Sequence, residues 1–287
     1  MDRHTLSNGR LGAAIKADGA ELCSLTADGR ELLWQAGPEW PRHAPVLFPI
    51  VGRLKDDTLR HRGRTFRMTQ HGFARDRRFT WEERTPTLCR LSLGDDAQTR
   101  ALYPFAFWLE LSFELDAEGL TVRHRLTNPG TEALPASLGG HPAFRWPLQE
   151  GVAKDAHELL FETDEPAPIR RVEDGLLSPQ PEPTPIEGRR LPLREGLFTR
   201  DAVILDQPAS RSVHYGAPGA PSLTVSWDGF RELGIWSKPS GAPFLCIEPW
   251  HGHASPADFD GEFMDKPGLL HLAPGEVREL SYRIAVG

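Results

Sequence analysis

The chain has 287 residues, of which 39% are apolar, so it can bury a large core and is not expected to be disordered. Its 27 glycines and 26 prolines are spread along the whole chain, and such frequent breakers favour many short strands over long helices. The formal net charge of −7 argues against nucleic acid or an anionic membrane as a partner, because those surfaces attract an excess of Lys and Arg.

Short strands are predicted in the first third of the chain at 11–15 and 88–93. The clearest pattern covers 105–115, where every second residue is large and apolar and most of the residues between them are polar. Turn residues at 116–119 end this run, and the alternation resumes over 120–126. Two alternating runs across a short turn that contains Gly predict a β-hairpin.

Weaker strand patterns follow at 223–227 and 244–247, and alternation over 280–286 predicts a last strand that reaches the C-terminus. The segment 152–165 fits neither the helical nor the strand period, and 179–192, with five prolines among charged residues, is interpreted as a surface loop. Strand patterns of the same character lie on both sides of that loop. Residues 1–287 are therefore predicted to form one all-β domain, a β-sandwich or barrel.

The three cysteines, Cys23, Cys89 and Cys246, lie far apart and form no CxxC pair, which suits a reducing compartment better than a disulfide framework. The first residues lack the apolar core of a signal peptide. No run approaches the ~18 apolar residues that a membrane helix needs. We therefore expect a cytoplasmic protein without a membrane partner.

Residues that could carry chemistry gather in four segments: FPIVGRL (48–54), QHGFARD (70–76), GGHPAF (139–144) and FLCIEPWHG (244–252). In the last, an apolar strand runs into Glu248, and a partly desolvated carboxylate is a stronger base. In the third, two glycines let the backbone approach a ligand, and His141 could donate a proton at neutral pH. A rim carboxylate paired with an arginine, and a histidine bonded within a tight turn, explain the same residues, so neither segment decides the function alone.

The other two segments and the residue after Pro249 offer binding groups. Gly72 argues against a helix that presents His71 and Arg75 on one face, so a loop or strand edge is expected, with His71 pointing into a cleft. Arg53 and Arg75 could bind a substrate or form structural ion pairs. Trp250 could support a sugar ring or belong to the core.

Together, HGFAR at 71–75, GGHPAF at 139–144 and IEPWHG at 247–252 resemble the aldose 1-epimerase family. FPIVGRLKDD at 48–57 and FDGEFMDKPGLLHLAPGE at 259–276 are similar to its bacterial branch, which includes the LacX-type proteins. The motifs follow in the same order to the C-terminus. The resemblance implies a galactose mutarotase-like supersandwich, a large antiparallel β domain that holds a sugar in an open cleft.

The resemblance also implies roles. Glu248 matches the general base that takes the proton from the anomeric hydroxyl, and His141 matches the general acid that protonates the ring oxygen. The ring then opens to the aldehyde, the C1–C2 bond rotates, and closure from the other face gives the other anomer. Three more residues match positions that bind the sugar: His71 on the ring-oxygen side, Arg53, and Asp201, for which Asp206 is the alternative.

This chemistry needs a base and an acid on opposite sides of the C1–O5 bond and no metal, nucleotide or covalent nucleophile. We therefore expect no cofactor, a small sugar as the substrate, and a monomer or homodimer. Arginines near the motifs (Arg53, Arg75, Arg77 and Arg78) leave a hexose 6-phosphate open, since phosphate is bound well by Arg.

Three other functions stay open at this point. A metalloenzyme could use Glu248, His251 and His253 with His71 or His141, although the spacing matches no specific zinc pattern. A glycoside hydrolase could use Glu248 and Asp201 as its two carboxylates, which would leave His141 without a role. A sugar-binding module without activity could have the same fold, but it would not need two proton carriers.

Overall fold

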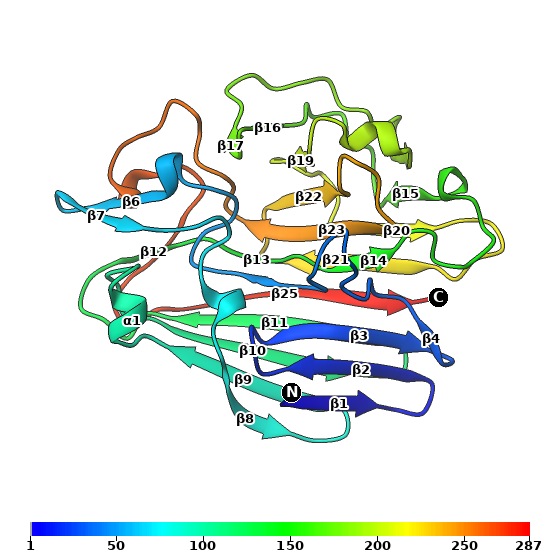
Figure 1. The fold of residues 1–287 in the computed structure, drawn as a ribbon, viewed down its shortest axis with the longest axis horizontal. Helices are drawn as coiled ribbons and strands as arrows, with labels where there is room; N and C mark the ends of the chain where they lie inside the picture. Colours follow the sequence, from blue (N-terminus) through cyan, green and yellow to red (C-terminus); the bar gives the residue numbers. More distant parts are fainter. Residues whose placement is uncertain (1) are drawn as a thin grey trace.

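A nine-stranded antiparallel sheet crosses the computed structural model, which describes residues 2–287 (Figure 1). Its strands, in spatial order, are β18 (Arg190–Pro192), β15 (Glu158–Phe161), β20 (Ser212–Gly216), β21 (Leu223–Asp228), β25 (Val277–Val286), β11 (Gly119–Thr127), β10 (Trp108–Leu115), β9 (Leu88–Gly94) and β8 (Thr80–Arg84). The C-terminal strand β25 therefore lies in the middle of the sheet, between β21 and β11.

A second sheet, of six strands, lies above β25 in the view of Figure 1. Its path is β19 (Val203–Leu205), β22 (Glu232–Trp236), β23 (Phe244–His251), β13 (Leu138–Gly140) and β5 (Val46–Leu47), and β14 (Ala143–Arg145) also pairs with β23. A four-stranded sheet contacts β9 and β10 and consists of β1 (Arg3–Ser7), β2 (Leu11–Lys16), β3 (Glu21–Ala27) and β4 (Arg30–Glu31).

The remaining elements are short. Three two-stranded ribbons pair β6 (Thr58–His61) with β7 (Arg64–Arg67), β12 (Leu134–Ala136) with β24 (Leu270–Leu272), and β16 (Val172–Glu173) with β17 (Leu176–Leu177). The one α-helix of residues 2–287 is α1 (Ala97–Arg100), and 3-10 turns cover Lys55–Asp57, Ala74–Asp76, Lys154–Ala156, Glu195–Phe198 and Phe263–Asp265. No helix in this part of the chain is long and apolar enough to cross a membrane.

The predicted hairpin is formed by β10 and β11, in which Leu111 faces His124 and Phe113 faces Val122. The strand begins at Trp108, later than the alternation suggests. The reason is local, since Phe107 donates its backbone N–H to the Asp95 carboxylate at 3.0 Å before strand pairing starts. Strands at 11–15, 88–93, 223–227, 244–247 and 280–286 are also confirmed, within β2, β9, β21, β23 and β25.

Two segments hold strands that the pattern did not predict. The segment 152–165 contains β15, and the predicted loop 179–192 ends in the edge strand β18, which pairs with β15. Pro192 is tolerated there because an edge strand leaves one row of backbone N–H groups without a partner. Both strands are short, which is why neither gives a readable period.

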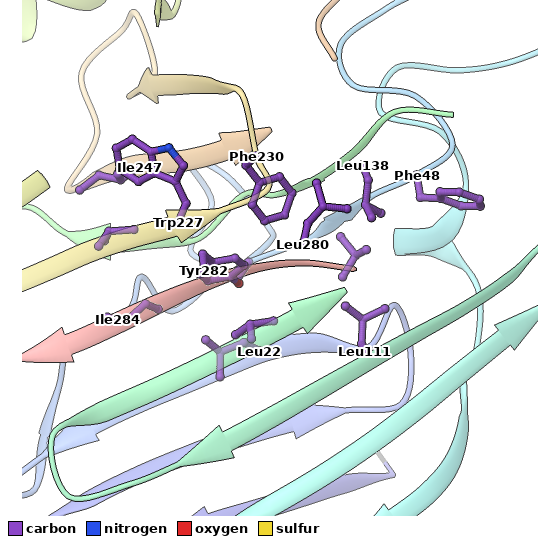
Figure 2. Packing of buried hydrophobic residues seen from close by; sticks show 14 of the residues in the cluster. Leu22, Phe48, Leu111, Leu138, Trp227, Phe230, Ile247, Leu280, Tyr282 and Ile284 are labelled. Atoms are coloured by element: carbon purple, nitrogen blue, oxygen red, sulfur yellow. The ribbon is translucent and has the colours of Figure 1, made fainter. Parts of the chain in front are cut away.

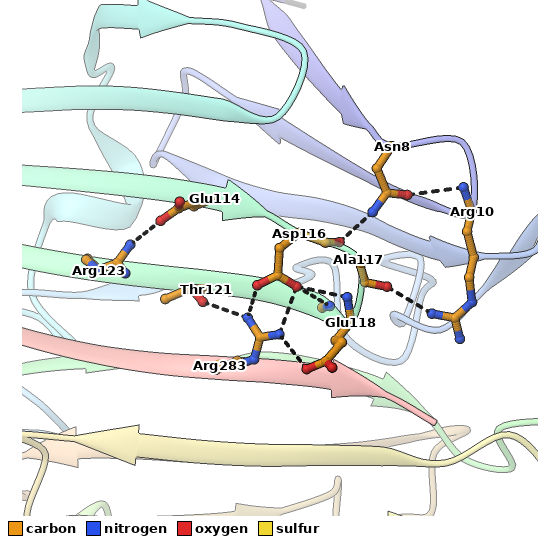
Figure 3. Close-up of polar contacts among 10 residues, drawn as sticks. Asn8, Arg10, Glu114, Asp116, Ala117, Glu118, Thr121, Arg123 and Arg283 are labelled. Carbon is orange, nitrogen blue, oxygen red and sulfur yellow. Dashed lines mark hydrogen bonds and ion pairs between the residues drawn. The ribbon is translucent and has the colours of Figure 1, made fainter.

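The turn between β10 and β11 is held by its aspartate (Figure 3). The Asp116 carboxylate accepts hydrogen bonds from the backbone N–H groups of Glu118 and Gly119, at 2.9 and 3.0 Å. Both of its oxygens also accept from the Arg283 guanidinium of the neighbouring β25, at 2.7 and 2.8 Å. The turn chemistry is visible in sequence, whereas the partner lies 167 residues away and is brought near only by sheet formation.

One continuous apolar core joins the three larger sheets. Leu111 of β10, Leu138 of β13, Ile247 of β23 and Tyr282 of β25 all belong to it (Figure 2). The six-stranded sheet therefore packs against the nine-stranded one through buried side chains. Because such an interior is close-packed, this contact fixes the position of the six-stranded sheet. A single domain over residues 1–287 is consistent with this continuous core and stays a prediction.

Candidate functional site

The predicted base lies on the central strand β23, all of whose residues are buried. Strand geometry places Cys246, Glu248 and Trp250 on one face, and Ile247 on the opposite face in the core. Glu248 is only 1% exposed, and no lysine or arginine of residues 2–287 lies within ion-pair distance of it. A carboxyl group in such a position is unusual, because burying a charge without a cation is costly.

The predicted acid meets Glu248 because pairing along β23 is interrupted. On one side of the gap, β13 pairs Gly139 with Trp250, and on the other, β14 pairs Ala143 with Cys246. The intervening His141–Pro142 leaves the ladder opposite Glu248, which lets the imidazole reach the carboxyl. Its Nε2 lies 3.2 Å from Oε2 of Glu248.

The two glycines before His141 serve packing. A Cβ at Gly139 would lie 2.7 Å from the Trp250 ring, and one at Gly140 would lie 2.6 Å from the Tyr282 ring. They make room for neighbouring aromatic side chains, and the expectation that they let the backbone approach a ligand stays a prediction. Their effect on the site is indirect, because Trp250 can then lie against the strand that leads to His141.

Burial shifts both proton carriers toward their neutral forms. It raises the pKa of Glu248 well above the ordinary carboxyl value, and the charge of Asp201 adds to this rise. It lowers the pKa of His141 to about 3, with a smaller contribution from the cationic Arg75 and Arg42. At neutral pH the pair therefore favours one mobile proton in total, held on the carboxyl side.

His71 approaches this pair from the segment after β7. Its ring lies edge-on to that of His141, with centroids 5.6 Å apart. Its Nδ1 accepts the backbone N–H of Gly52 at 3.1 Å, which leaves the other nitrogen, Nε2, as the N–H donor of a neutral ring. Gly72 makes the approach possible, since a Cβ there would lie 2.2 Å from the Phe48 carbonyl oxygen.

A cavity of about 350 Å³ opens onto these groups. It is lined by six of the seven residues that the sequence analysis selected: His71, Arg75, His141, Asp201, Glu248 and Trp250. Three tryptophans contribute apolar walls, namely Trp40, Trp236 and Trp250, and Gln70 adds a further polar group. A cavity of this size, with aromatic walls and a few converging polar groups, suits one small polar ring.

Comparison with known proteins decides the family. The model of the family described as aldose 1-epimerase matches residues 2–271. The chain belongs to the aldose 1-epimerase family. It is 33% identical to protein LacX of Lactococcus lactis over 98% of both chains.

Solved structures agree with this assignment. A galactose mutarotase related enzyme from Lactobacillus acidophilus has a TM-score of 0.92 at 32% identity, covering 99% of this chain and 97% of that one. A galactose mutarotase-like protein from Lactobacillus casei has the same TM-score at 30% identity, covering 99% and 100%. The predicted galactose mutarotase-like, all-β antiparallel fold of this aldose 1-epimerase family member is thereby confirmed.

Arg53 is the selected residue that does not line the cavity. Its guanidinium donates to both oxygens of Asp57, at 2.6 and 3.1 Å, and its side chain packs against the β16–β17 turn at Gly175. Gly175 itself lines the cavity, so the Arg53–Asp57 pair supports part of the cavity rim. Direct sugar binding by Arg53 in this family member stays a prediction.

Of the two aspartates considered, Asp201 lines the cavity. Its backbone has a φ of 63°, and its carboxylate accepts the N–H of Ala202 at 2.7 Å. The buried Arg171 donates to the carbonyls of Leu197, Asp201 and Ala202, at 3.0 to 3.2 Å, and so holds the turn. Asp206 instead lies 3.9 Å from Arg170.

The metal set considered from sequence does not come together as a whole, because strand alternation places His251 on the opposite face of β23 from Glu248. His251 faces away from Glu248, with Nδ1 3.4 Å from the Gly229 carbonyl, and Nδ1 of His253 lies 2.8 Å from the Ala254 carbonyl. The group that does gather is His141, Cys246 and Glu248, with ligand atoms within 4.8 Å. Burial raises the pKa of the Cys246 thiol well above its ordinary value, which disfavours the thiolate that a metal would need. We assign no metal to it.

Sequence reasoning missed Trp40, Trp236 and Gln70 as cavity residues. Gln70 directly precedes the HGFAR motif and could have been included with it. Trp40 lies in a loop whose two tryptophans stand among Gly and Pro, and aromatic residues in a loop are a usable signal for binding. Trp236 ends a buried strand and had no local signal.

Proposed function

We propose that the protein is an aldose 1-epimerase, a mutarotase that interconverts the α and β anomers of an aldohexose by general acid and base catalysis. The observation that carries the proposal is the buried contact of 3.2 Å between His141 and Glu248 at the wall of a cavity that fits one sugar ring. These are the two proton carriers that ring opening requires, and the family assignment supports the same reaction.

Ring opening moves two protons. The Glu248 carboxylate takes the proton of the anomeric O1–H, while the His141 imidazolium gives a proton to the ring oxygen O5. The C1–O5 bond breaks, its electron pair stays on O5, and C1 becomes the aldehyde carbon. Rotation about C1–C2 and the reverse transfers then close the ring with the opposite configuration at C1.

The electrostatics of the pair support this cycle. After ring opening Glu248 carries the proton and His141 is neutral, which is the arrangement that burial favours. The arrangement that starts the reaction differs from it by one proton transfer between Oε2 and Nε2, which lie 3.2 Å apart. The pair therefore holds the same number of protons before and after ring opening, and no external proton donor is needed.

The rest of the cavity provides binding. The rings of Trp236 and Trp250 offer flat apolar faces to the C–H groups of a sugar, and Asp201 and His71 offer an acceptor and a donor for its oxygens. Arg75 also lines the cavity, and this cation is the observation that favours a hexose 6-phosphate as the second candidate substrate.

Polarimetry tests the proposal. The change in optical rotation over time is measured with and without the protein for freshly dissolved α-D-glucose, α-D-galactose and α-D-glucose 6-phosphate. Glu248→Gln protein is the control for buffer and surface effects. Acceleration of one sugar beyond the control rate supports the proposal and identifies the substrate class. If folded wild-type protein gives the same rate as the control for each of the three sugars, the proposed reaction on these hexoses is overturned.

The pH dependence should carry the signature of one shared proton. We expect kcat/KM to show no acid limb near pH 6.5, where an ordinary imidazole would take up its proton. It should fall at lower pH, as His141 takes a second proton with a pKa of about 3, and at higher pH, as Glu248 loses its proton at its raised pKa. Initial rates by polarimetry, corrected for the buffer rate, measure this, and an acid limb centred near pH 6.5 would contradict it.

A further inference from the structure

The imidazole of His141 lacks the hydrogen bond that usually orients a catalytic histidine. Its Nε2 faces Glu248, while its buried Nδ1 has no hydrogen bond to any other residue of 2–287. In most sites the second ring nitrogen donates to a carbonyl or carboxylate, which fixes both the tautomer and the plane of the ring. Here the plane of the ring must be fixed in another way.

Aromatic rings surround the imidazole instead. Trp236 and His71 meet it edge-on, with interplanar angles of 84° and centroids 5.7 and 5.6 Å away. Trp40 alone covers a face, stacked at 4.9 Å with an interplanar angle of 26°. Rotation of the imidazole about the Cβ–Cγ bond would bring it into collision with the indole of Trp40. The stack therefore restricts the torsion that no hydrogen bond to another residue fixes.

Trp40 is itself held firmly, although it lies in a loop between β4 and β5. Its carbonyl accepts the indole N–H of Trp34 at 2.8 Å. The carbonyl of the preceding residue, Glu39, accepts from the ammonium group of Lys238 at 2.7 Å. Its ring also packs against Phe244, 5.5 Å away, on β23. The loop is therefore tied both to itself and to the segment after β22.

We propose that Trp40 is a positioning residue, whose indole holds the imidazole of His141 in the orientation for proton transfer to the sugar ring oxygen and shields it from water. The inference rests on the proposed mutarotase reaction, since it gives His141 its acid role. Small errors in the placement of a proton carrier are costly, because proton transfer needs heavy atoms within hydrogen-bond reach.

The kinetic test separates positioning from simple wall contact. In Trp40→Leu we expect kcat to fall by about ten- to a hundredfold with KM changed by less than about threefold, because the acid is present but not oriented. Trp40→Phe keeps a flat ring on the imidazole and should recover most of the rate. Trp108→Leu, at an exposed tryptophan of β10, is the matched control and should leave both constants unchanged. A rise in KM at constant kcat in Trp40→Leu would overturn the proposal.

A second readout does not depend on activity. The ring C–H resonance of His141, assigned by its absence from His141→Asn, is titrated by NMR in wild type and variants. The charged and titratable groups that act on this ring stay in place in every Trp40 variant: Glu248 and Cys246 of β23, His71, Arg75 and Arg42. We therefore expect Trp40→Leu to lose the ring-current shift of a stacked indole and to raise the pKa of His141 toward 6.5, whereas Trp40→Phe keeps both near the wild-type values.

The two readouts distinguish the two ways of failing. If wild-type protein accelerates no sugar while the NMR changes appear as expected, the proposed reaction fails and the orientation of His141 by Trp40 stands. If a folded Trp40→Leu protein keeps the wild-type resonance and pKa of His141, the inference about Trp40 is overturned whatever the activity. Should Trp40→Leu not fold, Trp34→Phe removes the N–H donor to the Trp40 carbonyl while it keeps an aromatic ring beside Phe244, and it should give the same changes at smaller size.

Discussion

Glu248→Gln is expected to abolish anomer interconversion, with a loss in kcat of at least about a thousandfold, while sugar binding stays largely intact. An amide has nearly the shape of the carboxyl group but cannot take the proton from the anomeric hydroxyl. Polarimetry measures the rate, and calorimetric titration with the sugar measures the binding. Wild-type rates in this variant would remove Glu248 from the role of base.

The same variant should be more stable than wild type at high pH. Burial raises the pKa of Glu248 in the folded protein, so the folded state holds this proton more tightly than the unfolded chain does. Stability from this group is complete below the ordinary carboxyl value of 4.5 and is lost as the pH rises through the raised value. Urea unfolding should therefore show Glu248→Gln close to wild type at pH 4.5 and clearly more stable than wild type at pH 8.

Glu232→Gln is the matched control for both effects. Glu232 is another buried carboxyl, on the neighbouring strand β22, and burial raises its pKa to about 7. It accepts the backbone N–H of Gly252 at 2.9 Å and does not line the cavity. Its replacement should change stability with pH but leave the rate within about twofold of wild type, because only a carboxyl in the cavity can meet the substrate.

His141→Asn is expected to lose most of the rate, about a hundredfold or more in kcat, because the proton for the ring oxygen has no other donor in the same place. The asparagine keeps a polar side chain at the cavity wall but cannot carry a mobile proton at these pH values. His71→Asn is the comparison, and it should mainly raise KM, since His71 is assigned to binding. A harmless His141→Asn combined with a severe His71→Asn would transfer the acid role to His71.

Glu248→Gln and His141→Asn change two residues of one site, so their losses in rate should not add. The proposed step needs the base and the acid together, and the double variant should be about as slow as the worse single one. This behaviour separates a shared proton-transfer step from two independent binding contributions, whose losses in free energy would sum.

Strand periodicity predicted part of the fold, and the sequence motifs predicted part of the site. The alternation in β10 and β11 predicted the central hairpin, because one face of each strand packs into the core. The motifs around Glu248, His141 and His71 likewise selected residues that line one cavity. The short strands β15 and β18 were not readable, since three or four residues cannot display a period.

The sequence by itself determined the β class and the motif order of the aldose 1-epimerase family, because these depend on local alternation and residue identity. The common face of Glu248 and Trp250 was not predicted, since it arises because β23 continues through Pro249 to His251. The tertiary structure alone decided the contact of His141 with Glu248, the stacking of Trp40 and the turning of Arg53 toward Asp57. It also decided the pKa values of the pair. Each of these depends on which distant segments exclude water from the same place, and burial of that kind arises only when the sheets pack.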